Sequence, residues 1–142
     1  MNDERKELER QVSLWLEIAQ EDYRLAKHAF TLSSPIPFRL IGYHAQQSAE
    51  KYLKAYLVSQ LIDFPYTHSI EFLINLCEEM TGIRIEVPDA YELSFYAIAK
   101  RYPGDYKNIT LEDAQRAISI ATHIRDYIVM TLRQRGFTIE NF

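Results

Sequence analysis

The chain has 142 residues, of which 47% are hydrophobic and 25% are charged, with a formal net charge of −4. A chain of this length buries roughly two-thirds of the surface that its unfolded form exposes. We therefore expect one domain over residues 1–142, which needs no disulfide or metal to fold. The ordinary balance of charged and apolar residues excludes a disordered or low-complexity chain. The negative net charge excludes a general basic coat for nucleic acid and leaves room only for a local basic patch.

Glycine is scarce, and the four glycines occur singly. Tight hairpins and phosphate-binding loops need glycine, because it adopts backbone conformations that other residues avoid. An all-β fold and a Walker or dinucleotide loop are therefore excluded.

The distribution of apolar residues argues against a membrane protein. No apolar run approaches the roughly 20 residues that span a bilayer, and the first five residues are charged or polar after Met1, unlike a signal peptide. The single cysteine, Cys77, excludes an intrachain disulfide. We expect a cytoplasmic protein.

Two long helices are predicted in the first half of the chain. Over residues 8–32 apolar side chains recur at steps of three and four, and Pro35 and Pro37 end the pattern. Over residues 38–60 they fill an arc of roughly 160°, which is typical of a central helix with more than one neighbour. The other side of this helix is polar, and its simpler interpretation is a solvated face in which Glu50 supports Lys54.

Three further helices are predicted over residues 69–81, 88–101 and 110–134. Each is bounded by residues that start or stop helices: a hydroxyl side chain or a proline before it, and a glycine or a proline after it. These are Thr67 or Ser69 and Gly82, then Pro88 and Pro103, then Thr110 and Gly136. Short connections predict antiparallel neighbours, so the expected fold is all-α: an antiparallel up-and-down bundle of about five helices. Its core covers about residues 8–136, with a C-terminal tail at 137–142.

The sequence predicts no metal, no cofactor and no catalytic residue. The four histidines lack the spacing of a zinc site. Cys77 lies on an apolar helix face, where a thiol resists ionisation, so we expect it to pack in the core.

Arg101 is the most unusual position, because it ends a helical stripe that is otherwise apolar. One interpretation is structural: a cation at a helix C-terminus that pairs with a carboxylate. The other is functional: a guanidinium beside two tyrosines, which can bind a phosphate and stack on a base. The residue types favour neither. The candidate carboxylates are Asp22, Glu50 and Asp105, and the tyrosines are Tyr102 and Tyr106.

Polar groups on the first two helices complete a candidate ligand site. Asp22 lies within an apolar stripe that also holds Trp15, so this carboxylate must be paired or at the rim. Trp15 itself is expected in the core, and His68 in a loop or cap. The candidate ligand-binding residues are Arg101, Tyr102, Asp105, Tyr106, Gln47, Lys51, Lys54 and Asp22.

Four motifs, in order over about residues 15–132, resemble the HEPN domain family. They are Trp15-x-x-x-Ala19-x-x-Asp22-x-x-x-Ala26, His44-Ala45-Gln46-Gln47-Ser48-Ala49-Glu50-Lys51-Tyr52-Leu53-Lys54-Ala55, Thr67-His68-Ser69-Ile70 and Ala99-Lys100-Arg101-Tyr102-Pro103. The resemblance implies a bundle of long helices that pairs into a homodimer and is often encoded with, or fused to, a small nucleotidyltransferase. The chain is also similar to the helical domain of the kanamycin nucleotidyltransferase type.

In the ribonuclease branch of that family, about four to six residues separate an arginine from a histidine, and the two act on RNA at the dimer interface. Arg101 matches the arginine, but Tyr106, Lys107 and Asn108 stand where the histidine is expected. Tyrosine and lysine titrate near 10 and are poor general bases at neutral pH. The resemblance therefore implies a module without metal-independent RNA cleavage.

Three functions remain open from the sequence. The first is a non-catalytic module that binds nucleotide or RNA phosphate near Arg101, as the partner of a separate nucleotidyltransferase. The second is a ribonuclease toxin of a toxin–antitoxin pair, with a histidine such as His44 or His68 supplied from elsewhere. The third is a purely structural interaction module in which Arg101 and Asp22 form an ion pair.

Overall fold

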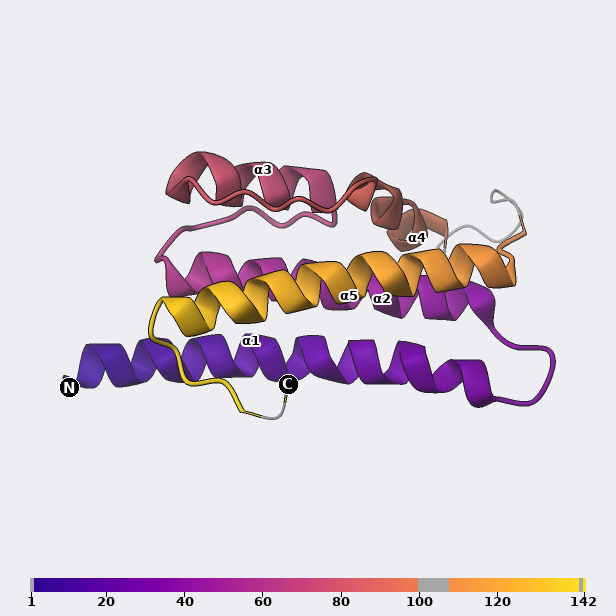
Figure 1. Ribbon diagram of the computed structural model, residues 1–142, viewed down its shortest axis with the longest axis horizontal. Coiled ribbons are helices and arrows are strands. Elements are labelled where there is room, and N and C mark those ends of the chain that lie inside the picture. Colours follow the sequence, from indigo (N-terminus) through magenta and orange to yellow (C-terminus); the bar gives the residue numbers. More distant parts are fainter. Residues whose placement is uncertain (1, 100–107, 141) are drawn as a thin grey trace.

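The computed structural model describes residues 2–99, 108–140 and 142. In these residues the ordered elements are all helical, which confirms the predicted all-α bundle (Figure 1). The elements are α1 (Asp3–His28), the 3₁₀ turn η1 (Ala29–Thr31), α2 (Phe38–Ser59), α3 (Ile70–Thr81), the 3₁₀ turn η2 (Ala90–Leu93), α4 (Ser94–Ala99) and α5 (Leu111–Gln134).

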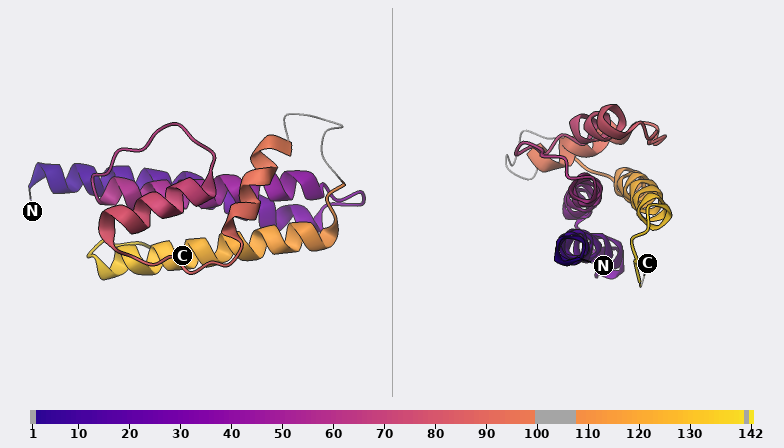
Figure 2. Two further views of the ribbon diagram at one scale, coloured as in Figure 1. Left: turned by 90° about the horizontal axis from the view of Figure 1, so that it is seen from above. Right: turned by 90° about the vertical axis from the view of Figure 1, so that its left-hand side faces the viewer.

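Helix α1 runs antiparallel to both α2 and α5, whereas α2 and α5 run in the same direction (Figure 1). Tyr23 of α1 hydrogen-bonds Thr122 of α5, and the C-terminal ends of α2 and α5 meet where Arg135 donates to Gln60. Between α2 and α5 the chain first turns back through residues 60–69, so that α3 also follows the direction of α2 (Figure 2). The up-and-down alternation therefore holds for α1 against its two long neighbours.

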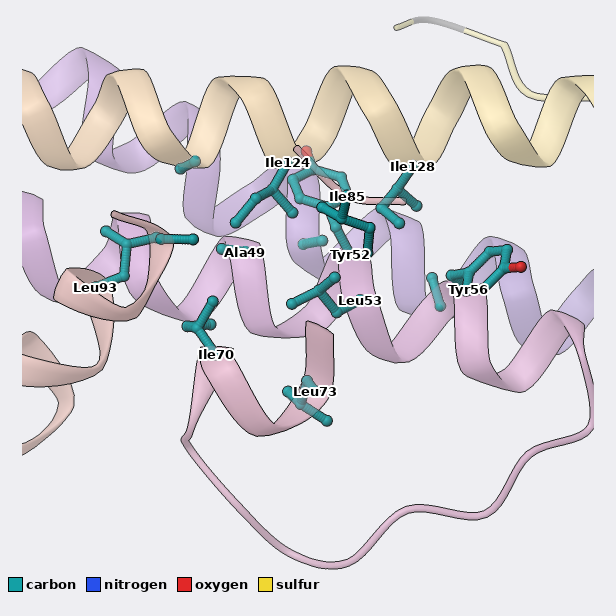
Figure 3. Packing of buried hydrophobic residues seen from close by; sticks show 14 of the residues in the cluster. Ala49, Tyr52, Leu53, Tyr56, Ile70, Leu73, Ile85, Leu93, Ile124 and Ile128 are labelled. Atoms are coloured by element: carbon teal, nitrogen blue, oxygen red, sulfur yellow. The ribbon is translucent and has the colours of Figure 1, made fainter. Parts of the chain in front are cut away.

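Helix α2 lies between α1 on one side and α3 with α4 on the other, as the end view in Figure 2 shows. Its apolar residues contact side chains from every neighbouring layer, including Ile70 and Leu73 of α3 and Ile124 and Ile128 of α5 (Figure 3). The prediction of a central helix with several neighbours is confirmed. The fully buried large side chains that α2 contributes are Ile41, Gln46, Tyr52, Leu53, Tyr56 and Leu57.

Side-chain caps set the starts of the helices. Ser69 accepts from the backbone N–H of Phe72, so it is the N-cap of α3, and Thr110 forms a complete capping box with Asp113. The predicted start of the first helix at residue 8 was wrong, because the helix begins five residues earlier at Asp3, after the N-cap Asn2. The four polar residues from Asp3 to Lys6 carry no apolar period, so periodicity could not detect this first turn.

The helix predicted over residues 88–101 is divided into η2 and α4. Asp89, just before η2, has the left-handed backbone conformation at φ 60°, which prevents an α-helix from starting at Pro88. The predicted end of this helix at Arg101 lies outside the described residues.

The segment after α5 adds to the core rather than forming a separate tail. Phe137 is buried beneath the guanidinium of Arg5, and Phe142 packs edge-on against Tyr52 with ring centroids 6.4 Å apart. The core therefore extends beyond residue 136.

Helix α4 is seated on α2 at Gly42. A β-carbon at this position would lie 2.4 Å from Cδ1 of Tyr96, well inside van der Waals contact. Glycine is therefore required here for close approach of the Tyr96 ring, although it disfavours a helix interior.

Two helix ends have the same hydrogen-bond pattern with different residues at the left-handed position. After α5, Phe137 N–H bonds the carbonyl of Leu132 and Gly136 N–H that of Arg133; after α2, Ile62 N–H bonds Leu57 and Leu61 N–H bonds Val58. Both patterns are Schellman motifs. Gly136 has φ 93°, but Leu61 has φ 58° with 81% of the side chain exposed, so Leu61 is strained without the compensation of burial.

We expect Gly42→Ala to lower the free energy of unfolding by about 1–3 kcal/mol, because the added methyl group overpacks the Tyr96 ring. In a Tyr96→Leu background the same change is expected to be neutral or stabilising, since alanine is the better helix former. Urea unfolding of the four proteins of this cycle measures the coupling. Equal effects of Gly42→Ala in both backgrounds would contradict the close contact.

We expect Leu61→Gly to raise the free energy of unfolding by roughly 0.5–1 kcal/mol, because glycine relieves the left-handed strain and little packing is lost. Gly136→Ala is the matched reverse change and should lower it by a similar amount. Thermal and urea unfolding check both. A loss of stability in Leu61→Gly would contradict the assignment of strain.

Candidate functional site

The predicted ligand residues fall into three groups. Arg101, Tyr102, Asp105 and Tyr106 lie outside the described residues. Asp22 and Lys51 come together between α1 and α2. Gln47 and Lys54 come together around Glu50, on the side of α2 that faces residues 60–69.

Asp22 is held by two side chains from α2, His44 and Lys51. His44 Nδ1 lies 2.8 Å from Asp22 Oδ1, and Lys51 Nζ donates to Oδ2. Burial alone would raise the pKa of this carboxyl, but the hydrogen bonds and charges of His44 and Lys51 outweigh it and hold the pKa below its usual value. The side chains of His44 and Lys51 keep 25% and 24% exposure, so this cluster remains accessible to an anion.

Glu50 is the centre of a second, more deeply buried network. Its Oε1 accepts from Lys54 Nζ at 2.7 Å, and its Oε2 accepts from Gln46 Nε2 at 3.0 Å and from His68 Nδ1 at 3.1 Å. Gln47 Nε2 adds a longer contact at 3.4 Å. Both oxygens of this carboxylate thus accept hydrogen bonds, as a buried charge requires.

Lys54 has little freedom to bind a ligand. Only 8% of the residue is exposed, and Nζ lies 5.5 Å from the ring centroid of Phe64 and 5.9 Å from that of Trp15, in addition to its bond to Glu50. The predicted solvated face was therefore wrong for Glu50 and Lys54. Glu50 and Lys54 are buried because residues 60–69 and α1 cover this side of α2 with aromatic side chains and peptide carbonyls.

Trp15 and Cys77 lie where the sequence predicts. Trp15 packs against the core with its ring edge-on to Phe64, at a centroid distance of 6.0 Å. Cys77 is fully buried on α3, and burial raises its pKa to about 12. A thiol with that pKa is un-ionised at neutral pH and serves as a packing residue.

His44 and His68 are residues of a type that often takes part in catalysis, and the sequence did not indicate their hydrogen-bond partners. Each places Nδ1 against a carboxylate from elsewhere in the fold, at separations of 22 and 18 residues. Sequence spacing carries no signal for such contacts. The positions of the carboxylates did give a signal. Asp22 and Glu50 lie within or near apolar stripes, so each needs a hydrogen-bond partner.

The described structure has surface grooves along α1. One runs between α1 and the C-terminal segment, with Gln20, Arg24 and Phe142 in its wall, and another lies between α1 and α5, with Lys27 and Arg125. Among residues 2–99, 108–140 and 142, no group of three or more metal-binding side chains gathers. None of the described helices has the length and apolar content needed to cross a bilayer.

The model of the HEPN domain matches residues 12–132. The chain belongs to the HEPN domain family. Comparisons with curated proteins and with solved structures gave no match. In this HEPN domain the polar motif of α2 has an internal role. His44 and Lys51 tie α1 to α2 through Asp22, and Glu50 and Gln46 tie residues 60–69 to α2 by bonding the ring and the carbonyl of His68.

We expect Asp22→Asn to lower the free energy of unfolding at pH 7 by about 1–3 kcal/mol, because Lys51 and His44 lose a charged acceptor. The folded-state pKa of Asp22 is below the unfolded value of about 4, so its contribution is present above pH 4 and is lost as the pH falls toward the folded pKa. The gap between wild type and variant should therefore narrow between pH 5 and pH 2 in urea unfolding.

Asp126→Asn is the matched control, because Asp126 pairs with Arg125 at an exposed position and such pairs contribute little. A gap between wild type and Asp22→Asn that stays constant over this pH range would contradict the assignment.

Proposed function

We propose that this HEPN domain is a non-catalytic module that binds nucleotide or RNA phosphate at Arg101. The observation that carries the proposal is the sequence Arg101-Tyr102-Pro103, which begins two residues after the end of α4 at Ala99. A guanidinium binds a phosphate through two parallel hydrogen bonds, and an adjacent tyrosine offers a ring on which a base can stack.

The docking of α4 supports this position for a binding site. Tyr96 is packed on Gly42 and its hydroxyl donates to the carbonyl of Asp113 at 3.4 Å, so the helix that leads to Arg101 is fixed against both α2 and α5. A ligand-binding side chain gains affinity when its support is rigid, because less conformational freedom is lost on binding.

The two lysines of α2 have different parts in the proposal. Lys51 keeps part of its side chain in solvent while it binds Asp22, so it supports the binding of an anion from the α1–α2 side. Lys54 is neutralised by Glu50 and is assigned to the fold. Gln47 donates to Gln46 at 2.8 Å and is likewise used internally.

The non-catalytic assignment rests on the residues after Arg101. Ribonucleases of this family have four to six residues between the arginine and a histidine, and Tyr106, Lys107 and Asn108 occupy the histidine positions here. His44 and His68 belong to other elements, where each is oriented by a carboxylate. Family membership also supports a homodimer that serves a separate nucleotidyltransferase as its partner.

We expect Arg101→Ala to weaken binding of ATP or short RNA tenfold or more, equivalent to about 1–3 kcal/mol for a lost charged hydrogen-bond pair. Isothermal titration at 50 mM salt measures the dissociation constant, and circular dichroism checks that folding is unchanged. Arg10→Ala is the matched control, because Arg10 is exposed and pairs only with Glu7 on α1 in the described structure.

Equal affinity of Arg101→Ala and wild type would overturn the site. Cleavage of the RNA by wild type, abolished in Arg101→Ala, would overturn the non-catalytic assignment and favour the ribonuclease.

A further inference from the structure

A tyrosine, a histidine and a glutamate form a continuous hydrogen-bonded chain before α3. Tyr66 Oη lies 3.1 Å from His68 Nε2, and His68 Nδ1 lies 3.1 Å from Glu50 Oε2. The two rings meet edge-on with centroids 5.1 Å apart. None of these residues belongs to the phosphate site proposed above.

The carboxylate determines the direction of the hydrogen bonds. An ionised Glu50, held by Lys54, can only accept, so Nδ1 of His68 donates the hydrogen and Nε2 presents its lone pair. That lone pair accepts the phenolic hydrogen of Tyr66. A nucleophile bonded to a base, with the base oriented by a third group, is the arrangement that activates hydroxyl nucleophiles in enzymes.

The two ends of the chain differ sharply in exposure. The side chain of Glu50 is 4% exposed and anchored by the network on α2, whereas Tyr66 is 85% exposed. An exposed aromatic ring contributes little to stability, so burial does not explain its placement. The oxygen is accessible to a reagent in solution, while the base behind it is held in place.

We propose that Tyr66 is a primed acyl-acceptor site, in which His68 acts as the base and Glu50 as the positioning residue. Tyr66 Oη attacks the carbonyl carbon of an activated acyl donor, forming the new O–C bond as the phenolic proton moves to His68 Nε2. The bond from that carbon to the leaving group breaks, and the leaving group departs with the electron pair and takes the proton from His68. The products are an ester at Tyr66 and the protonated leaving group, with no change in oxidation state.

The electrostatics favour an acyl group over a phosphoryl group. A transferring phosphoryl group carries negative charge that needs a cation or metal beside it. The lysine of this cluster, Lys54, already has its ammonium bound by Glu50. An uncharged acyl group needs no such neutralisation.

N-Acetylimidazole provides a direct test on the full chain. We expect acetylation of Tyr66 at pH 7.5 to be at least about tenfold faster than that of Tyr91, which is 58% exposed. Exposure alone predicts less than a twofold difference. Peptide mass spectrometry over time measures both rates in one sample, and in denaturant the two rates should become equal.

His68→Gln should reduce the Tyr66 rate to that of Tyr91, and His123→Gln, at an exposed position on α5, should leave it unchanged. Circular dichroism verifies the fold of both variants. A native rate ratio below twofold, or a fast rate that survives in His68→Gln, would overturn the proposal. Fast acyl uptake at His68 in Tyr66→Phe would also overturn it, because the histidine would then be the nucleophile.

Discussion

The buried carboxylate of Glu50 is the constraint on which much of this fold depends. Helix α2 is covered by α1, α3, α4 and α5 (Figure 2), so the part of its polar side that carries Gln46, Glu50 and Lys54 lies inside the protein. A charge in that position is tolerated only when donors surround it. Lys54 and Gln46 supply donors from the same helix, and His68 supplies one from the segment that covers it. The network therefore fixes the path of residues 60–69, which in turn places the start of α3.

Asp22 has the corresponding role between the first two helices. His44 and Lys51 are seven residues apart, two turns of α2, and both reach the same carboxylate of α1. The pairing fixes the register of α1 against α2 while leaving the side chains of His44 and Lys51 partly in solvent. Asp22 of α1 and Glu50 of α2 thus divide the polar residues of α2 into a rim cluster and a buried cluster.

The close approach of α4 to α2 is the second constraint on the fold. Gly42 admits the ring of Tyr96, and burial together with Asp113 and Glu92 raises the pKa of that phenol to about 12. The contact seats a helix of only six residues, which could not be stable by itself. The position of α4 on the bundle therefore depends on the missing β-carbon of Gly42.

The sequence alone predicted the long helices, the cap of α5 at Thr110, a choice of Thr67 or Ser69 for the cap of α3, and the burial of Cys77, because periodicity and capping are local properties of the chain. It also showed that Asp22 needed a partner, since an unpaired carboxylate in an apolar stripe is unstable. Only the tertiary structure decided which partner that was, and it showed that Lys54 is buried rather than solvated. The reason is geometric: contacts such as His68 with Glu50 join segments 18 residues apart, and the burial of one face of a helix depends on what the rest of the chain places against it.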